Sequence, residues 1–516
     1  MGILDLDMKL SYIAIVAALV LFAQGISGCL VPRKPWGLRD ADATGAVDVG
    51  SDSEVTTDSA NAIDQKLADV DVFTAIDSAG DTPAGGDITD GADGGVDLGN
   101  DAVDVEELDG VAPPRSTITA APVNTTSRGA SFGFTCDQAP CTYQCQLDEG
   151  IWVPCTSPHE YFDVGVGEHT FKVQAEKNGV FENSPQKHTW TILAISSIEC
   201  GVWNTCALLN DNSLWCWGDN TYGQLGIGSN DEKDQLVPIK IGTSSWDQLS
   251  YGQIHACAIS AGKLYCWGNN YSFQLGYGGS SLFSPKQVGS DDVWVHVSSG
   301  GGHTCGIKDV SAFTGQFSNV LYCWGSVFSG QVGNNVVSDL EGDNVNAPLK
   351  IGNDTDWAIV TVGYESSCAI KTDKSLYCWG ANASVSAPAK VGSDANWDHV
   401  SLGSGHTCAI KTDKSLYCWG GNTYGQLGHS TPGNTPQPVG QLKVWERVSV
   451  GSQHSCAIRS DGSLWCWGDN ADGQLGVDSI SGSTETPTRV GLAKWKVISA
   501  GNSHSCGIKD DDSLWC

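Results

Sequence analysis

A short hairpin pattern that recurs seven times between Cys206 and Cys516 constrains this chain more than any other feature. In its clearest copy, residues 403–411 and 415–420 read as two strands separated by a three-residue turn. Every copy carries one cysteine on each strand, and both cysteines keep matching distances from the turn although turn length varies. Because turn length sets register, the two cysteines of a copy are predicted to face each other.

Directly opposed residues in antiparallel strands lie about 4.5–5.5 Å apart at Cα, a separation that a disulfide can span. On the chain-entropy estimate each bridge would contribute roughly 2–3 kcal/mol. The alternative is seven pairs of buried free thiols, which an exported location disfavours. The predicted pairs are Cys206–Cys216, Cys257–Cys266, Cys305–Cys323, Cys368–Cys378, Cys408–Cys418, Cys456–Cys466 and Cys506–Cys516.

Residues 1–29 have the pattern of an export signal. The apolar run 11–23 is short for a bilayer span. It is followed by Ile-Ser-Gly-Cys at 26–29, which resembles a bacterial lipobox in which Cys29 becomes the lipid-modified first residue. A plain secretory signal and an uncleaved anchor are the alternatives, and all three place the rest of the chain outside the cytoplasm.

Two details refine this signal. The residues before the apolar run are acidic, with Asp5 and Asp7, so Met8 is the more natural start. Leu30 follows Cys29, and this position lacks the Asp that retains some lipoproteins at the inner membrane. We therefore expect an outer-membrane or cell-surface location and contact with the membrane through a lipid on Cys29.

Residues 30–115 are predicted to be a disordered acidic linker. Between Asp40 and Gly110 there are twenty Asp or Glu residues and a single basic residue, Lys66. Such a segment cannot bury enough apolar surface to offset its ordering entropy. Weak calcium binding is the alternative, but no Gly-bearing, Glu-closed loop of EF-hand spacing is present. The formal charge of −31 also argues against nucleic acid as a partner.

Residues 116–193 are predicted to form a small β-sandwich, because 131–135, 142–147 and 169–175 alternate like strands. The runs 143–148, 154–158 and 167–171 resemble a bacterial immunoglobulin-like or fibronectin type III-like module, usually a spacer. That resemblance implies a Cys145–Cys155 disulfide and leaves Cys136 and Cys141 to pair with each other.

Residues 194–516 hold the repeats, at periods of 40 to 57 residues. One unit is read as a proline strand at 387–392, a tryptophan strand at 397–403, and then the hairpin. Four strands per unit with glycine-rich turns indicate a β-propeller. Side chains alternate in Trp465-Cys466-Trp467, so aromatics should fill one inter-blade gap of each blade and disulfides the other.

The motif Gly-x-x-His-x-Cys-Ala-Ile, then Leu-Tyr-Cys-Trp-Gly-x-Asn, then Gly-Gln-Leu-Gly resembles the regulator of chromosome condensation repeat family. Its cysteine content resembles the exported bacterial branch. The resemblance covers all of 194–516 and implies a seven-bladed propeller. Family members include guanine-nucleotide exchange factors and a secreted β-lactamase inhibitor protein, but neither activity transfers residue by residue, because fold does not fix function.

The ends of the array do not match. The first unit lacks the proline strand, and the last stops at Cys516 before its Trp-Gly-x-Asn segment. A sequence that continues beyond Cys516 would close the ring, so a C-terminal truncation is expected. Cys200 is left without an assigned partner, which that continuation would supply.

Histidines recur at one repeat position, two residues before a cysteine. A zinc site is conceivable from the residue types, but each of these cysteines has a cross-strand partner, so a structural hydrogen-bonding role is favoured. The carboxylates Asp373, Asp413, Asp461 and Asp510 are placed at hairpin turns, where Asp stabilises the turn. The five histidines are His255, His303, His406, His454 and His504, and no cofactor, metal or catalytic residue is predicted.

We expect a non-catalytic binding or adhesion module for a protein or glycan, presented at the cell envelope. Its ligand should contact the loops of the propeller, above all the insertions 228–235, 310–319 and 326–346. The alternatives are an inhibitor of an exported enzyme such as a β-lactamase, an exchange factor by family name only, and an uncharacterised propeller enzyme.

Overall fold

The computed structural model describes residues 112–229, 234–477 and 482–516. The predicted lipidation site Cys29, the export signal and nearly all of the acidic linker lie outside these residues. In the described part, no helix has both the length and the apolar character needed to cross a membrane.

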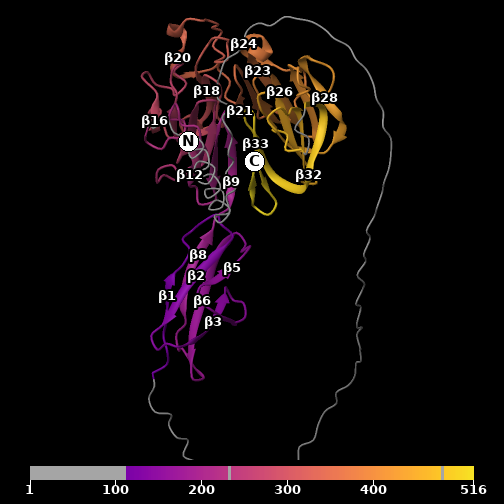
Figure 1. Ribbon diagram of the computed structural model, residues 1–516. Helices are drawn as coiled ribbons and strands as arrows, with labels where there is room; N and C mark the ends of the chain where they lie inside the picture. The colour runs from indigo at the N-terminus through magenta and orange to yellow at the C-terminus, as the bar shows by residue number, and fades with distance from the viewer. Residues whose placement is uncertain (1–111, 230–233, 478–481) are drawn as a thin grey trace, which may run out of the picture. The chain divides into compact units, whose positions relative to one another are not determined.

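Residues 116–192 form the predicted small β-sandwich (Figure 1). Phe132 of one sheet stacks on Phe171 of the other with 4.0 Å between ring centroids, and Trp190 and Ile192 complete the buried core. One sheet has the order β1-β2-β5, and the other has β4-β3-β6-β7 with β8 also on β6. The strands are β1 Ser116–Ala120, β2 Ala130–Cys136, β3 Thr142–Leu147, β4 Val153–Cys155, β5 His159–Tyr161, β6 Gly167–Lys177, β7 Val180–Phe181 and β8 Gln186–Ile192.

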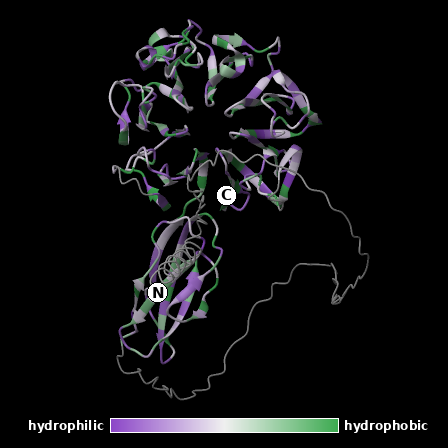
Figure 2. Cartoon of the chain, turned by 45° about the horizontal axis from the view of Figure 1, so that its top comes forward, coloured by the Kyte–Doolittle hydropathy of each residue, from purple (hydrophilic) through white to green (hydrophobic). Residues whose placement is uncertain are grey.

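The repeats form a seven-bladed β-propeller, whose blades stand in a ring (Figure 2). Each blade is an antiparallel sheet whose strands follow one another in chain order from the axis outward. Blades 1 to 5 are β9 Ile195–Cys200, β10 Asn204–Leu209, β11 Leu214–Gly218 and β12 Gln235–Lys240; β13 Gln248–Tyr251, β14 His255–Ser260, β15 Lys263–Gly268 and β16 Leu282–Gln287; β17 Trp294–Ser299, β18 His303–Asp309, β19 Asn319–Gly325 and β20 Val345–Lys350; β21 Trp357–Val362, β22 Ser366–Lys371, β23 Leu376–Gly380 and β24 Val385–Lys390; β25 Trp397–Leu402, β26 His406–Lys411, β27 Ser415–Gly420 and β28 Gly433–Lys443.

Blades 6 and 7 share one long strand. Its first part pairs with β31 and its second part with β33, so it passes from the outside of one blade to the inside of the next. Short helical turns lie in the loops: α2 Ser311–Thr314, η1 Glu341–Asp343 and η2 Ala381–Ala383. The strands of these blades are β29 Trp445–Val450, β30 His454–Arg459, β31 Ser463–Asp469, β32 Ser483–Ala500, β33 Ser505–Lys509 and β34 Leu514–Trp515.

In the hairpins the two cysteines lie opposite each other, as the register argument predicted. Cys206 is opposite Cys216 in blade 1, and Cys408 is opposite Cys418 in blade 5. The propeller pairs have Cα separations of 4.0–4.1 Å, slightly below the expected range. In the described residues the structure joins all nine predicted pairs, including Cys136–Cys141 and Cys145–Cys155. Cys200 is buried and free.

The sequence suggested that the proline strand is the first strand of a unit, but in the structure it is the last strand of the preceding blade. Strand β24 pairs with β23 of the hairpin before it, not with β25. The first blade is therefore complete, and the seventh has three strands among the described residues. The sequence could not show this, because a strand between two hairpins can pair with either until the ring fixes which one is near.

Aromatic residues and disulfides meet in the same gap and do not fill separate gaps. The Cys206–Cys216 bridge of blade 1 packs against Trp246 and Trp267 of blade 2. The Cys408–Cys418 bridge of blade 5 packs in the same way on the next blade. In a ring, the disulfide face of every blade must meet the aromatic face of its neighbour. Full burial of each large side chain contributes roughly 1.5–3 kcal/mol.

The turn carboxylates act locally. Asp373, Asp413 and Asp461 each accept hydrogen bonds from the backbone N–H and hydroxyl of a serine two residues later. In the last blade this role belongs to Asp511, not to Asp510, because the run of three aspartates hides the register.

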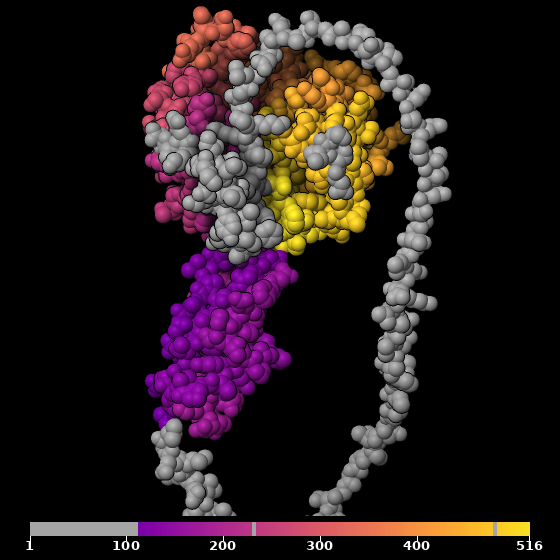
Figure 3. Space-filling view, in the orientation of Figure 1, coloured from indigo at the N-terminus to yellow at the C-terminus, as the bar shows by residue number. Residues whose placement is uncertain are grey.

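A ring of glycines closes the propeller around its axis. The inner strand of each blade ends at one of these glycines, and an added Cβ on Gly403 would lie 2.0 Å from the carbonyl oxygen of Gly451. Backbone hydrogen bonds run between blades beside these contacts, and the last blade donates to the first through Asn502 N and Gly201 O at 3.2 Å. Strands β9 and β33 consequently lie side by side in Figure 1, and Figure 3 draws the same side of the propeller as a space-filling surface. The glycines are Gly201, Gly252, Gly300, Gly363, Gly403, Gly451 and Gly501.

We predict that Gly403→Ala lowers the free energy of unfolding by about 1–3 kcal/mol, because the neighbouring backbone must shift to admit a methyl group. Gly405→Ala is the matched control, since a Cβ there meets nothing within 4 Å. Thermal unfolding of both variants checks this. Equal midpoints for the two variants would contradict the steric role of the ring.

Candidate functional site

The five repeat histidines lie between blades, not in an open site. Each Nε2 faces a hydroxyl of the following blade: Thr304 for His255, Ser367 for His303, Ser455 for His406, Ser505 for His454 and Thr205 for His504, at 2.8–3.2 Å. Four of these hydroxyls donate onward to the backbone carbonyl of a Gln-Leu or Gln-Val loop in the histidine's own blade. We call this chain of contacts the histidine relay.

The relay fixes the protonation of these histidines. Each of the four hydroxyls that donates to a carbonyl accepts from its ring, so Nε2 carries the hydrogen in the histidines paired with them, His255, His303, His406 and His454. Nδ1 is buried in all five, without a hydrogen-bond partner in the described chain. Burial lowers the pKa of His406 to about 3 and that of His504 to about 4. These rings are neutral at pH 7 and hold blades together.

The gap between blades 1 and 2 has an equivalent set of hydrogen bonds made by different residues. Blade 1 carries Asn204 in place of histidine, and blade 2 carries Ala256 in place of the hydroxyl. The Tyr251 hydroxyl, which reaches in from the inner strand, accepts from Asn204 Nδ2 and donates to the Gln224 carbonyl. The sequence analysis missed Tyr251, although the coincidence of two exceptions in neighbouring units was a signal.

Cys200, His504 and Cys506 form the one group of potential metal ligands found within the described residues. Cys506 is already bonded to Cys516, which removes its thiolate from that set. Burial raises the pKa of the Cys200 thiol to about 12. The group is therefore better suited to packing than to metal binding.

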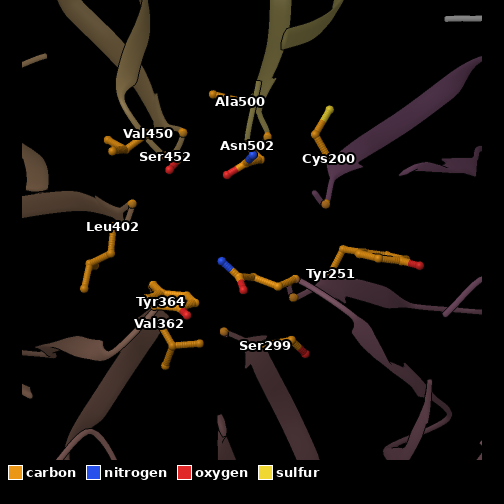
Figure 4. Close-up of a pocket in the computed structure, with 18 of the residues that line it drawn as sticks. Cys200, Tyr251, Ser299, Val362, Tyr364, Leu402, Val450, Ser452, Ala500 and Asn502 are labelled. Atoms are coloured by element: carbon orange, nitrogen blue, oxygen red, sulfur yellow. The ribbon is translucent and has the colours of Figure 1, made fainter. Parts of the chain in front are cut away.

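A narrow hollow of about 190 Å³ lies on the propeller axis, lined by the glycine ring and the residues beside it. In Figure 4, Asn502 and Ser452 reach toward its centre, whereas Tyr251 and Leu402 turn away between the blades. Glu199 also lines it, and burial raises the pKa of its carboxyl to about 7. Most of the lining is backbone, serine and small aliphatic side chains, which offers little acid–base chemistry.

A larger groove of about 630 Å³ lies over the loops of blades 2, 3 and 4, and we call it the loop groove. It shares Gln253, Gly301 and Tyr364 with the axial hollow, so the two are continuous. Exposed apolar side chains line it at Tyr271, Phe328, Leu340 and Tyr364, together with the carboxylates of Asp339, Glu341 and Glu365. A lining that combines exposed apolar side chains with carboxylates suits a partner that offers both apolar and basic side chains.

Of the three insertions named from the sequence, 326–346 contributes to the loop groove. Insertion 310–319 connects the hairpin strands β18 and β19, which places it at the opposite end of the blade, where Phe313 and Phe317 are exposed. Insertion 228–235 follows β11 at the same end as the groove, and residues 230–233 lie outside the described chain.

Models of the regulator of chromosome condensation (RCC1) repeat match 195–224, 357–384, 397–426 and 445–474, and also 211–259, 261–307, 413–458 and 461–508. The propeller is RCC1-like. The matched segments leave out 308–356, the part that carries the insertion beside the loop groove.

Several known proteins resemble this chain. The ultraviolet-B receptor UVR8 of Arabidopsis thaliana is 29% identical over 180 residues, 34% of this chain and 37% of the receptor. Human WBSCR16 has a TM-score of 0.54 at 20% identity, over 72% of this chain and 100% of that one. Prp20p of Saccharomyces cerevisiae has a TM-score of 0.54 at 20% identity, over 72% of this chain and 93% of that one. The matched regions span well under half the length of the curated relatives, and the structural likenesses concern the fold alone.

The histidine relay predicts a pH dependence of stability. Each relay histidine takes up a proton near pH 6.5 when unfolded but only near pH 3–4 when folded. The unfolded chain thus binds more protons between these values, so stability is full above about pH 6.5 and falls as the pH drops through this window.

His406→Gln should reduce the slope of the free energy of unfolding against pH, between pH 6 and 4.5, by about 1.4 kcal/mol per pH unit. Urea unfolding of the wild type and the variant at several pH values measures this difference, in which the common contribution of carboxylates cancels. Parallel pH profiles would show that His406 is not buried in its neutral form.

Proposed function

We propose that this chain is a non-catalytic protein-binding module and that the loop groove is its docking surface. The observation that carries the proposal is the groove itself, where the loops of three blades bring exposed aromatic and carboxylate side chains around one hollow of about 630 Å³. Exposed apolar groups gathered at one place commonly mark protein-interaction sites, and loops on a rigid scaffold commonly carry binding residues.

The related propellers support protein as the class of ligand. One solved structure shows Kap60 bound to yeast RCC1 (Prp20), and another reports binding of Prp20p to Gsp1p and histones. Those partners belong to those proteins. What carries over to this chain as a proposal is the use of the propeller as a protein-binding platform, with a partner suited to its own loop groove.

We further place the module outside the cytoplasm, anchored by a lipid on Cys29 at the outer membrane or cell surface. Disulfides at nine pairs are typical of an oxidising compartment. The lipobox-like segment at 26–29 and the acidic residues that follow fit an anchor and an extended tether. In this arrangement the propeller would capture a partner at the cell envelope.

Affinity capture with the tagged full-length chain from detergent-solubilised cell envelopes tests the binding surface. The double substitution Phe328→Ser and Tyr364→Ser should weaken binding of the captured partner at least tenfold, because hot-spot aromatics carry most of the binding energy of an interface. Tyr424→Ser is the matched control, since Tyr424 is an exposed aromatic in the equivalent loop of blade 5. Capture that survives the double substitution, or capture of a glycan alone, would overturn the proposal.

The anchor has its own test. Cys29→Ser should move the protein from the membrane fraction to the soluble extracytoplasmic fraction and remove metabolic labelling by fatty acid, because the modified thiol is lost. Cys200→Ser, which alters a buried thiol away from the signal, should leave labelling intact. Fatty-acid labelling that persists in the Cys29 variant would refute this anchor.

A further inference from the structure

The gap between blades 4 and 5 lacks the element that fills the corresponding gaps. In the others that can be compared, a carbonyl of the Gln-Leu or Gln-Val loop accepts two hydrogen bonds from the next blade. Gln274 O accepts from Thr304 Oγ1 at 2.8 Å and from Trp324 Nε1 at 2.9 Å. Gln331 O and Gln426 O accept the same pair of donors, a serine hydroxyl and an indole N–H.

The residue after that glutamine fills the remaining space. Leu225, Leu275, Val332 and Leu427 all occupy this place and are fully buried. A filled gap therefore contains one acceptor and one branched aliphatic side chain, both supplied by the earlier blade.

Blade 4 has neither group. After Gly380 its chain makes the short turn η2 and enters β24 at Val385, so no Gln-Leu segment is present. Blade 5 nevertheless keeps both donor positions, with Thr407 and Trp419 only 1% and 3% exposed. Blade 4 therefore supplies no glutamine carbonyl to Thr407 Oγ1 or Trp419 Nε1 of blade 5.

These omissions leave a cavity of about 330 Å³. Its walls include the Cys368–Cys378 bridge and the rings of Trp379 and Trp419. Asn382 also lines it, and its Nδ2 is buried without a partner in the described residues. Lys390 lies at the exposed margin.

We propose that this cavity binds an uncharged small molecule that carries a carbonyl acceptor beside an apolar aliphatic or aromatic body. The ligand's carbonyl replaces the missing glutamine carbonyl as the acceptor for Thr407 Oγ1 and Trp419 Nε1. Its apolar body occupies the space that leucine fills in the other gaps. The volume lies within the range of ligand pockets. A cationic ligand is disfavoured, because no Asp or Glu among the described residues lines the cavity and burying an unpaired cation is costly.

The test uses the full-length protein and two fluorinated probes followed by fluorine NMR line broadening. 4-Fluoroacetophenone has an acceptor and an apolar ring, whereas 4-fluorotoluene has the ring without the acceptor. We expect the first probe to bind at least tenfold more tightly, since its carbonyl can accept from both donors and the hydrocarbon probe cannot.

Thr407→Val keeps the shape of the cavity and removes one donor, so it should weaken 4-fluoroacetophenone three- to tenfold. Thr304→Val changes the equivalent hydroxyl in a filled gap and should leave binding unchanged. Ala383→Phe should block the cavity, because Ala383 lines it. Circular dichroism confirms that each variant is folded. Binding of neither probe, equal binding of both, or equal effects of Thr407→Val and Thr304→Val would overturn the proposal.

Discussion

The close approach of seven inner strands around the axis is the constraint on which the rest of the propeller depends. At six of the seven ring glycines an added Cβ would meet the carbonyl oxygen of the next blade's glycine, and at Gly201 it would meet the side chains of Asn204 and Tyr251, so no side chain fits there. The same absence of a Cβ makes room for the relay imidazoles, since a Cβ on Gly252 would lie 2.7 Å from His255 Cε1. The ring therefore sets the distance between blades at which the histidine relay, farther out, can form.

From the axis outward, one pattern of contacts recurs between blades 2 and 3, blades 3 and 4, and blades 5 and 6. A neutral histidine meets a hydroxyl, the hydroxyl and an indole meet one carbonyl, and a disulfide packs on tryptophan. The relay pairs Nε2, the hydroxyl and one indole N–H, whereas Nδ1 and the indole nitrogens of tryptophans such as Trp246 and Trp294 are buried without a partner in the described residues. That pairing explains why a histidine that looks like a ligand in the sequence has a structural role.

The departures from the pattern are more informative about function than the pattern. Where Asn204 replaces histidine, Tyr251 restores the hydrogen bonds, so the gap stays closed. Where blade 4 loses its Gln-Leu loop, nothing compensates and a cavity lined by donors remains. Where blade 3 gains an insertion, Leu340 and its neighbours extend the loop groove. A regular repeat builds the scaffold, and two of its exceptions form the groove and the cavity for which we propose a partner and a ligand.

The sequence alone determined the all-β class, the propeller and the facing cysteines of each hairpin. These follow from local rules, namely side-chain alternation, turn length and the repeat of a four-strand unit. Tertiary structure decided which hairpin the proline strand joins, which contacts Tyr251 makes, and that insertion 326–346 borders a groove whereas 310–319 lies at the other end of its blade. The physical reason is that local rules leave the choice between neighbouring strands and loops open, and the packing of blades around the ring makes that choice.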